Sequence, residues 1–179
     1  MKKWVSVFLI YLFMSVSVEA QTRWKVQPGA KVTFKIKNAG FNVDGSFSGL
    51  SATILFEAGQ LAKSKIEASI KANTINTGIT ARDNHLRRSD YFYVEKYPLI
   101  KMSSQKIIKQ GNQYLGYFNL SIREVSKSIE IPFTFSQSGD QAVFSGNFTL
   151  NRRDYNVGGW SLVLGNEVQI FLQIPVEKE

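Results

Sequence analysis

Cysteine is absent from this 179-residue sequence, and histidine occurs once, as His85. Without cysteine the chain forms no disulfide bond and has no thiolate for catalysis or metal binding. One imidazole without a thiolate does not make a zinc or copper site, and the carboxylates lack the spacing of a calcium loop. We therefore expect no bound metal and a domain that folds on its hydrophobic core alone.

Long apolar runs are also scarce, and the one that stands out covers residues 4–18, behind two lysines. A positive start, a short apolar segment and small residues up to Ala20 are typical of a secretory signal peptide. A membrane anchor is the alternative, but the run is shorter than the ~20 residues that span a bilayer. We expect a signal peptide at residues 1–20, cleaved near Ala20, and a periplasmic or secreted mature domain at residues 21–179 that does not span the membrane.

Acidic residues are outnumbered, with 14 Asp and Glu against 22 Lys and Arg, for a net charge of +8. The leader removes two lysines and one glutamate, which lowers the net charge to +7. A basic surface favours anionic membranes or acidic partners, or simply keeps the protein soluble. No basic cluster contains interleaved exposed aromatics, so no nucleic-acid partner is expected.

Alternation of polar and apolar residues dominates the rest of the chain. In residues 31–37, Val32, Phe34 and Ile36 share one side, and lysines and a threonine share the other. This period of two predicts a half-buried strand. The predicted strands cover residues 31–37, 41–56, 63–72, 99–109, 114–123, 129–135, 142–150 and 167–176. Gly45 and Gly49 within the second predict a bulge or a close backbone approach.

These strands have one apolar face each, and all the apolar faces need a common core. An antiparallel sheet of about eight strands achieves this by closing on itself, which also removes its edges. The sequence therefore predicts an all-β fold, an eight-stranded antiparallel barrel. A β-sandwich is the alternative.

Residues 77–98 form the one long interval that does not alternate. Thr80 fits an N-cap with Asp83 reaching back to its amide, and Ile79 and Leu86 would share the apolar side of a short helix. We expect a short helical insert near one end of the barrel.

An eight-stranded barrel is just wide enough to be filled by side chains or to hold one small ligand. Small inward residues such as Ala68, Gly116 and Gly146 leave room among the phenylalanines, or fit the taper of a filled barrel. A long, narrow, apolar lumen suits an extended hydrocarbon chain. The predicted ligand contacts are Phe34, Ile36, Ile54, Phe56, Ile70, Leu86, Phe92, Met102, Phe118, Leu120, Phe133, Phe148 and Ile170. Each is equally a core candidate, because alternation does not separate the two roles.

Arg82, His85 and Arg152 are the candidates for polar contact with a ligand head group. The alternative for Arg82 and His85 is hydrogen bonding to loop carbonyls. For Arg152 it is an ion-pair cluster with Arg153 and Asp154 that fixes the last long loop. A triad of His85 with nearby serine and aspartate is disfavoured, because neighbours in sequence seldom adopt triad geometry. No catalytic residue is predicted.

Several short motifs occur together in a specific order and spacing. They are Trp24 with Phe34, Gly45-Ser-Phe47, Asn76-Thr-Gly78, Arg82-Asp-Asn-His-Leu86, Ser89-Asp-Tyr-Phe92, Lys96-Tyr-Pro98, Leu120-Ser-Ile-Arg123, Val125-Ser-Lys127, Asn151-Arg-Arg-Asp-Tyr155 and Val157-Gly158. Through them the chain resembles the YceI-like family of exported, lipocalin-like, polyisoprenoid-binding proteins. The resemblance implies a lipocalin-like barrel with a helix near one end. It also implies a polyprenyl chain or isoprenoid quinone in the lumen, with no other cofactor.

The sequence departs from the family at Glu124 and Asn156, where glycine is usual. Asparagine tolerates a positive φ. Glutamate does so less readily, so we expect a longer or differently shaped hairpin at Glu124.

The expected function is that of a carrier or storage protein for an isoprenoid lipid, with no bond made or broken. A homodimer is compatible with it. The alternative is a protein-interaction module whose barrel is filled by side chains. Enzymatic activity is the third hypothesis for the function.

Overall fold

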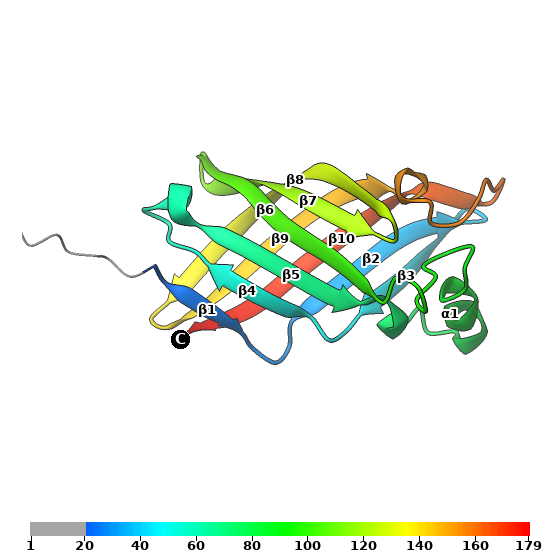
Figure 1. The fold of residues 1–179 in the computed structure, drawn as a ribbon, viewed down its shortest axis with the longest axis horizontal. Coiled ribbons are helices and arrows are strands. Elements are labelled where there is room, and N and C mark those ends of the chain that lie inside the picture. The colour runs from blue at the N-terminus through cyan, green and yellow to red at the C-terminus, as the bar shows by residue number, and fades with distance from the viewer. Residues whose placement is uncertain (1–20) are drawn as a thin grey trace, which may run out of the picture.

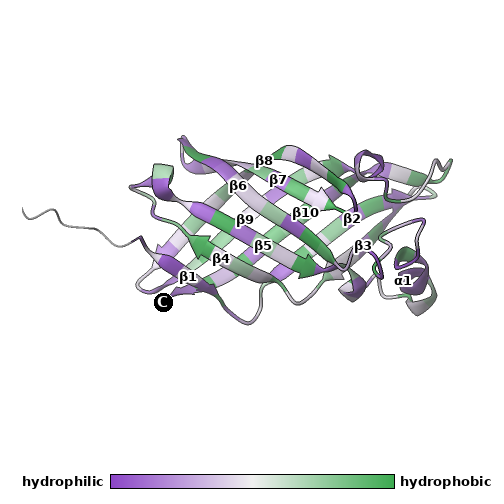
Figure 2. Ribbon diagram, viewed as in Figure 1, coloured by the Kyte–Doolittle hydropathy of each residue, from purple (hydrophilic) through white to green (hydrophobic). Residues whose placement is uncertain are grey.

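The computed structural model describes residues 21–179, so the expected signal peptide at residues 1–20 lies outside the described residues. The elements, in chain order, are β1 (Arg23–Val26), β2 (Lys31–Asn38), β3 (Phe41–Phe47), β4 (Ser51–Leu55), η1 (Leu61–Lys63), β5 (Lys65–Lys71), η2 (Ala72–Thr74), α1 (Thr80–Leu86), β6 (Leu99–Gln110), β7 (Gln113–Ile122), β8 (Val125–Ser138), β9 (Gln141–Asn151), η3 (Arg152–Tyr155) and β10 (Leu164–Lys178). Hydrophilic and hydrophobic residues follow one another along the strands, as Figure 2 shows.

The sheet closes on itself through antiparallel pairs. Its ring runs β1-β4-β5-β6-β7-β8-β9-β10, and β1 then pairs with β10. The other two strands extend this ring at one end, because β2 pairs with the remaining length of β10 and β3 pairs with β2 (Figure 1). The predicted eight-stranded antiparallel barrel is therefore confirmed, and the sandwich alternative does not apply.

The structure has two strands more than the eight that were predicted. The predicted strand 41–56 breaks into β3 and β4 around Gly49, whose φ of +72° favours glycine. β1 was not predicted; it is short and pairs with the C-terminal end of β10. Gly45 allows a close approach, because a Cβ atom there would lie 2.2 Å from the ring of its cross-strand partner Phe34.

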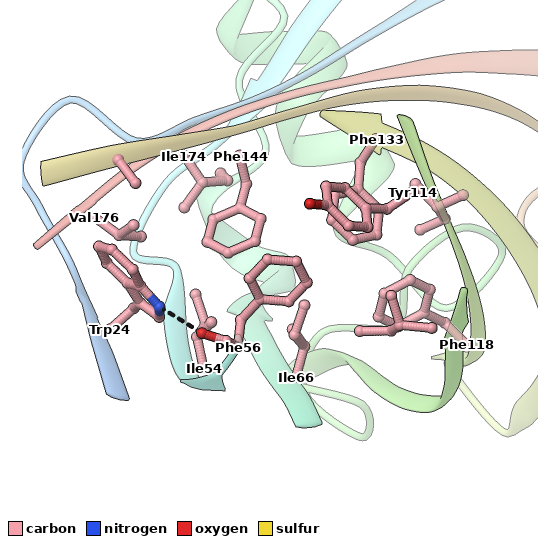
Figure 3. Close-up of a cluster of buried hydrophobic side chains, with 13 residues drawn as sticks. Trp24, Ile54, Phe56, Ile66, Tyr114, Phe118, Phe133, Phe144, Ile174 and Val176 are labelled. Atoms are coloured by element: carbon pink, nitrogen blue, oxygen red, sulfur yellow. Dashed lines mark hydrogen bonds between the residues drawn. The ribbon is translucent and has the colours of Figure 1, made fainter. Parts of the chain in front are cut away.

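One half of the barrel interior is filled by side chains (Figure 3). We call this cluster the aromatic core: Trp24, Ile54, Phe56, Ile66, Ile107, Tyr114, Phe118, Ile131, Phe133, Ala142, Phe144, Ile174 and Val176. The Phe56 ring lies 5.2 Å from the rings of Tyr114 and Phe144, nearly perpendicular to both. The Trp24 indole donates to the buried Phe56 carbonyl at 2.9 Å. Burial of each such side chain contributes ~1.5–3 kcal/mol, so this half stabilises the fold.

Two of the small inward glycines belong to this filled half. A Cβ atom at Gly116 would lie 2.2 Å from the Phe118 ring, and one at Gly146 would lie 2.9 Å from the Pro132 carbonyl. Their missing side chains are therefore compensated by neighbouring protein atoms and leave no space for a ligand. Ala68, in contrast, lines a cavity in the other half.

The insert covers that other end of the barrel, away from the C-terminus (Figure 1). The predicted capping box is wrong. Ile79 is the N-cap residue and is exposed, and Asp83 accepts from the Thr77 amide at 2.8 Å and the Thr77 hydroxyl at 2.6 Å. Thr77 lies one turn earlier and satisfies the buried carboxylate more fully than a single amide at Thr80 would.

The turn between β7 and β8 has only two residues, because Ile122 pairs directly with Val125. The expected longer hairpin at Glu124 is therefore wrong. The positive φ falls on Arg123 (+56°) instead of on the glutamate. Asn156 adopts the left-handed conformation expected for it, with φ of +55°.

Candidate ligand-binding cavity

A cavity of about 210 Å³ lies between the aromatic core and the insert. Its wall is almost wholly apolar and comes from β2, β3, β5, β6, β7, β9 and β10 and from the insert. Predicted ligand contacts found on the wall are Phe34, Ile36, Ile70, Leu86, Phe92, Met102, Leu120, Phe148 and Ile170. Their contact with a ligand stays a prediction, but the structure brings them together around one space.

Four predicted contacts lie away from this cavity, namely Ile54, Phe56, Phe118 and Phe133, which belong to the aromatic core. Alternation predicts their inward orientation correctly. Along the barrel axis, however, they lie among other side chains and not beside the cavity. Alternation indicates which side of a sheet a residue faces. It does not indicate at which height along the barrel axis the side chains fill the lumen.

Other wall residues were missed. Some share the alternation of predicted strands and could have been included: Ile100, Ile122, Leu150, Val168 and Leu172. Others come from irregular segments, where period two gives no signal: Ile75, Tyr91, Tyr155 and Val157. Phe47 joins these groups, because its ring contacts Phe34 at 5.7 Å and Phe92 of the insert at 5.6 Å.

Arg82 lines the cavity, but its guanidinium is already hydrogen-bonded. Its Nε donates to the Thr77 hydroxyl and one Nη to the Thr77 carbonyl, both at 2.7 Å. The Thr77 hydroxyl in turn donates to Asp83. Arg82, Thr77 and Asp83 therefore fix the start of the insert, which agrees with the loop-carbonyl alternative.

His85 does not lie on the cavity wall. Its side chain is about half exposed, with Nε2 3.6 Å from an Asp90 carboxylate oxygen and the ring 4.9 Å from the Tyr91 ring. A head-group contact from His85 is therefore not supported by its position. Because Asp83 bonds Thr77 and His85 approaches Asp90, the imagined triad is not assembled either.

Arg152 lies on the wall and is only 4% exposed. Its guanidinium donates to the carbonyls of Val157 at 2.8 Å and Gly165 at 2.9 Å, and to the Asn166 side chain at 3.1 Å. Burial lowers the pKa of Arg152 from its usual value. The predicted ion-pair cluster is wrong, because Asp154 pairs with Lys127 at 3.3 Å and Arg152 is satisfied by carbonyl groups.

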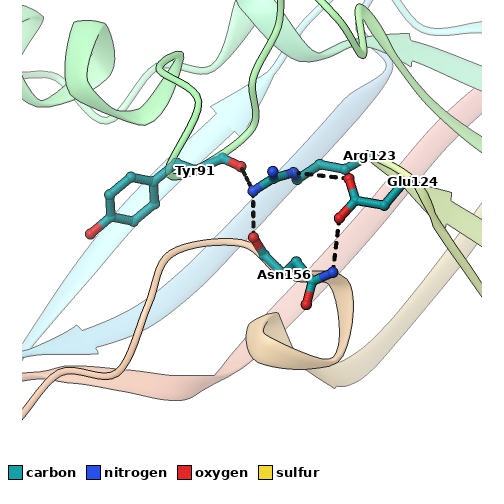
Figure 4. A network of polar contacts seen from close by, with 4 residues as sticks. All are labelled: Tyr91, Arg123, Glu124 and Asn156. Atoms are coloured by element: carbon teal, nitrogen blue, oxygen red, sulfur yellow. Dashed lines mark hydrogen bonds and ion pairs between the residues drawn. The ribbon is translucent and has the colours of Figure 1, made fainter.

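A polar network joins the insert to two other chain segments above the cavity (Figure 4). The Arg123 guanidinium donates to the carbonyls of Tyr91 and Asn156, and it lies 3.4 Å from a Glu124 carboxylate oxygen. The Asn156 side chain donates to Glu124 at 2.8 Å, which lowers the pKa of that carboxyl. These contacts hold the insert, the β7–β8 turn and the loop after η3 together as one cover.

Two further observations apply to residues 21–179. No helix in this part of the chain is both long and apolar enough to cross a bilayer. Over the same residues, no three His, Asp or Glu side chains gather in an arrangement that could hold a metal ion.

Comparison with known proteins places this geometry in context. The solved structure of BcnA from Burkholderia cenocepacia superimposes with a TM-score of 0.81 at 24% identity, covering 84% of this chain and 99% of that one. A polyisoprenoid binding domain from Saccharophagus degradans superimposes with a TM-score of 0.68 at 15% identity, covering 89% and 99%. At these identities the likeness shows a shared fold.

Sequence comparison extends the likeness beyond the fold. The chain is 27% identical over 155 residues to a UPF0312 protein of Photorhabdus laumondii, covering 81% of each protein. The YceI-like domain matches residues 24–176, which is nearly all of the described chain. The chain therefore belongs to the YceI-like domain family.

Proposed function

We propose that this protein binds an isoprenoid lipid, either a polyprenyl chain or an isoprenoid quinone, in its apolar cavity and stores or carries it without chemical change. The observation that carries the proposal is the cavity itself, which has an almost wholly apolar wall. The polyisoprenoid binding domain of Saccharophagus degradans, which shares the fold, supports it. Export to the periplasm or outside the cell, with cleavage near Ala20, belongs to the same proposal.

The cavity size bears on how much lipid is enclosed. An apolar cavity of ~150 Å³ is known to hold benzene, so one of about 210 Å³ suits on the order of two isoprene units. At ~0.8 kcal/mol for each buried carbon, about ten carbons give a gross ~8 kcal/mol. This corresponds to micromolar affinity before the costs of ordering the ligand are subtracted.

The binding role is tested by filling the cavity. Ala68 lies on the wall, opposite Met102 in the sheet, so we expect Ala68→Phe to abolish binding of farnesol in a fluorescence-displacement or calorimetric titration. Gln169→Phe is the matched control, because Gln169 is exposed between the wall residues Val168 and Ile170 and points outward.

Organic extraction of the purified wild-type protein, followed by mass spectrometry, identifies the lipid. An extract without isoprenoid, together with no uptake of farnesol or a short-chain quinone, would contradict the proposal. Equal binding by the Ala68→Phe and Gln169→Phe variants would show that the ligand binds elsewhere.

A further inference from the structure

Two turns at the cavity end of the barrel expose large apolar side chains to solvent. We call these four residues the apolar tip, with their exposed fractions: Phe41 (76%), Trp160 (70%), Leu162 (85%) and Val163 (57%). Phe41 lies at the start of β3, and the other three lie in the loop before β10, on the same end of the barrel as α1 (Figure 1). The Ala39 amide donates to the Val163 carbonyl at 2.8 Å, which ties the two turns together.

The apolar tip is continuous with the cavity wall. Asn38 and Val43 on either side of Phe41 line the cavity, and so do Val157 and Leu164 on either side of the second turn. The exposed apolar surface therefore runs directly into the enclosed one. Exposed apolar residues that gather in this way mark a contact surface, whereas singly scattered ones need no explanation.

The two chain segments that carry the apolar tip are almost uncharged. Residues 36–43 and 155–166 contain no aspartate or glutamate, and Lys37 is their one charged side chain. Asp154, just before the second segment, is paired with Lys127. Other acidic residues adjoin the two segments, namely Asp44, Glu124 and Glu167; Asp44 lies 3.5 Å from Lys35 and Glu124 lies 3.4 Å from Arg123. The protein without its leader carries a net charge of +7, which favours an anionic surface.

We propose that the apolar tip docks on the surface of a lipid bilayer, with Trp160 and Leu162 in the headgroup region and the cavity facing the membrane. Tryptophan prefers the membrane–water interface, and projecting turns with exposed apolar ends suit a soft lipid surface. The biological purpose of this docking rests on the proposed function: a prenyl chain that leaves the bilayer at this point would reach the cavity without crossing water. The docking itself is measurable without any cavity ligand.

The protein contains its own probe for this contact. Within residues 21–179 the tryptophans are Trp160, which is exposed, and Trp24, which is 2% exposed in the aromatic core. Vesicles of phosphatidylcholine with about one-third phosphatidylglycerol should shift the Trp160 emission to the blue and protect it from acrylamide. Co-sedimentation with the same vesicles should be stronger than with pure phosphatidylcholine and should weaken as salt is added.

The double variant Trp160→Ser/Leu162→Ser removes two of the four apolar side chains. We expect its partition onto the mixed vesicles to fall at least about tenfold. Phe171→Ser is the matched control, because Phe171 is also exposed but lies on the outer wall of β10. Thermal unfolding of each variant verifies that it is folded, and the fluorescence of the wild type gives a readout that needs no variant.

The possible outcomes separate this inference from the proposed function. In one outcome, the wild type binds farnesol normally in vesicle-free solution and yet shows neither a blue shift nor co-sedimentation with vesicles. That result overturns the docking and leaves the proposed function intact. Vesicle binding that depends on the tip, in a protein that never takes up farnesol, supports the docking and contradicts the proposed function. A wild-type dimer that the tip substitutions convert to a monomer, without vesicle binding, would assign the tip to self-association instead.

Discussion

Arg152 shows how one buried cation shapes the loop beside the cavity. It donates hydrogen bonds to Val157 at the start of the loop 156–163 and to Gly165 and Asn166 just after the loop. The planar guanidinium reaches these acceptors at once because its donors are fixed in a fork. Arg152 therefore positions the loop instead of presenting a free charge to a ligand.

Replacing Arg152 by lysine keeps the charge but loses the fork. We expect Arg152→Lys to lower the free energy of unfolding by about 2–4 kcal/mol, because buried acceptors lose their donors. Urea unfolding followed by circular dichroism measures the change. Arg153→Lys is the control, since Arg153 is exposed. Equal stability of the two variants would show that the hydrogen bonds of Arg152 contribute nothing.

Tyr155 is the second residue whose environment predicts a measurable effect. Its hydroxyl is buried and has no hydrogen-bond partner among the described residues, and burial raises its pKa above the usual value of ~10. A raised pKa means that the folded state favours the neutral phenol. The contribution of Tyr155 to stability is therefore complete below about pH 10 and is lost as the pH rises beyond it.

Tyr155→Phe removes the unpaired hydroxyl and the titration together. We expect the variant to be as stable as the wild type at pH 8, or more stable by up to ~1 kcal/mol. Between pH 8 and pH 11 it should lose less stability than the wild type. Guanidinium unfolding at the two pH values tests this, with the other tyrosines as a common background. A larger loss in the variant would contradict the assignment.

At the scale of elements, the cover over the cavity depends on a close approach between the loop after η3 and the insert. The Gly158 amide donates to the Asp90 carbonyl at 2.8 Å. A Cβ atom at Gly158 would lie 2.7 Å from the Tyr91 ring and 2.8 Å from the Arg152 guanidinium, and the φ of +69° disfavours other residues.

Gly158→Ala should therefore push the loop away from the insert. We expect a loss of about 1–3 kcal/mol in the free energy of unfolding, from strain and overpacking. Hydrogen exchange should become faster at the amides of residues 86–97, which the contact holds in place. Gly159→Ala is the control, because nothing lies within 4 Å of the position its Cβ would take. Unchanged exchange in the Gly158→Ala variant would contradict a coupled cover.

At the scale of the whole molecule, the barrel is divided into a filled half and a hollow half. Phe118 lies at this division. It belongs to the aromatic core, while Leu120, the next inward residue of β7, lines the cavity. The Phe118 ring covers Gly116, on the side of the aromatic core, and lies one inward position from the cavity wall. The aromatic core therefore limits how deep a prenyl chain enters, if the proposed function holds.

Phe118→Ala should deepen the cavity and change the preferred chain length. We expect binding to shift from farnesol toward the longer geranylgeraniol, with a loss of about 3–5 kcal/mol in stability. Phe144→Ala is the matched control, because Phe144 lies deeper in the aromatic core. Its next inward neighbour on β9, Gly146, does not line the cavity, whereas Leu120 beside Phe118 does. The Phe144→Ala variant should lose similar stability and keep the wild-type preference. The same preference in both variants would show that Phe118 does not set the limit.

Individual residues show which contacts could be predicted from the sequence and which could not. Alternation predicts that the strand residues among the expected ligand contacts, from Phe34 to Ile170, face the interior, and they do. The spacing of a capping box predicts that Asp83 accepts from the Thr80 amide, but Asp83 accepts from the amide and hydroxyl of Thr77, because the chain folds back there. Proximity in sequence suggests Asp154 as an ion-pair partner of Arg152, yet the partners of Arg152 include Gly165 and Asn166, which tertiary contacts bring near.

The amino-acid sequence by itself determined which side of the sheet most strand residues face and which family the chain resembles. These properties depend on local periodicity and on short motifs. Only the tertiary structure decided that the sheet closes as a barrel and not as a sandwich. It also decided how far along the axis the aromatic rings meet, and hence which inward residues surround a space and which fill it. The physical reason is that filling depends on the stagger between strands and on the fit of rings such as Phe56 and Phe118 against residues distant in sequence.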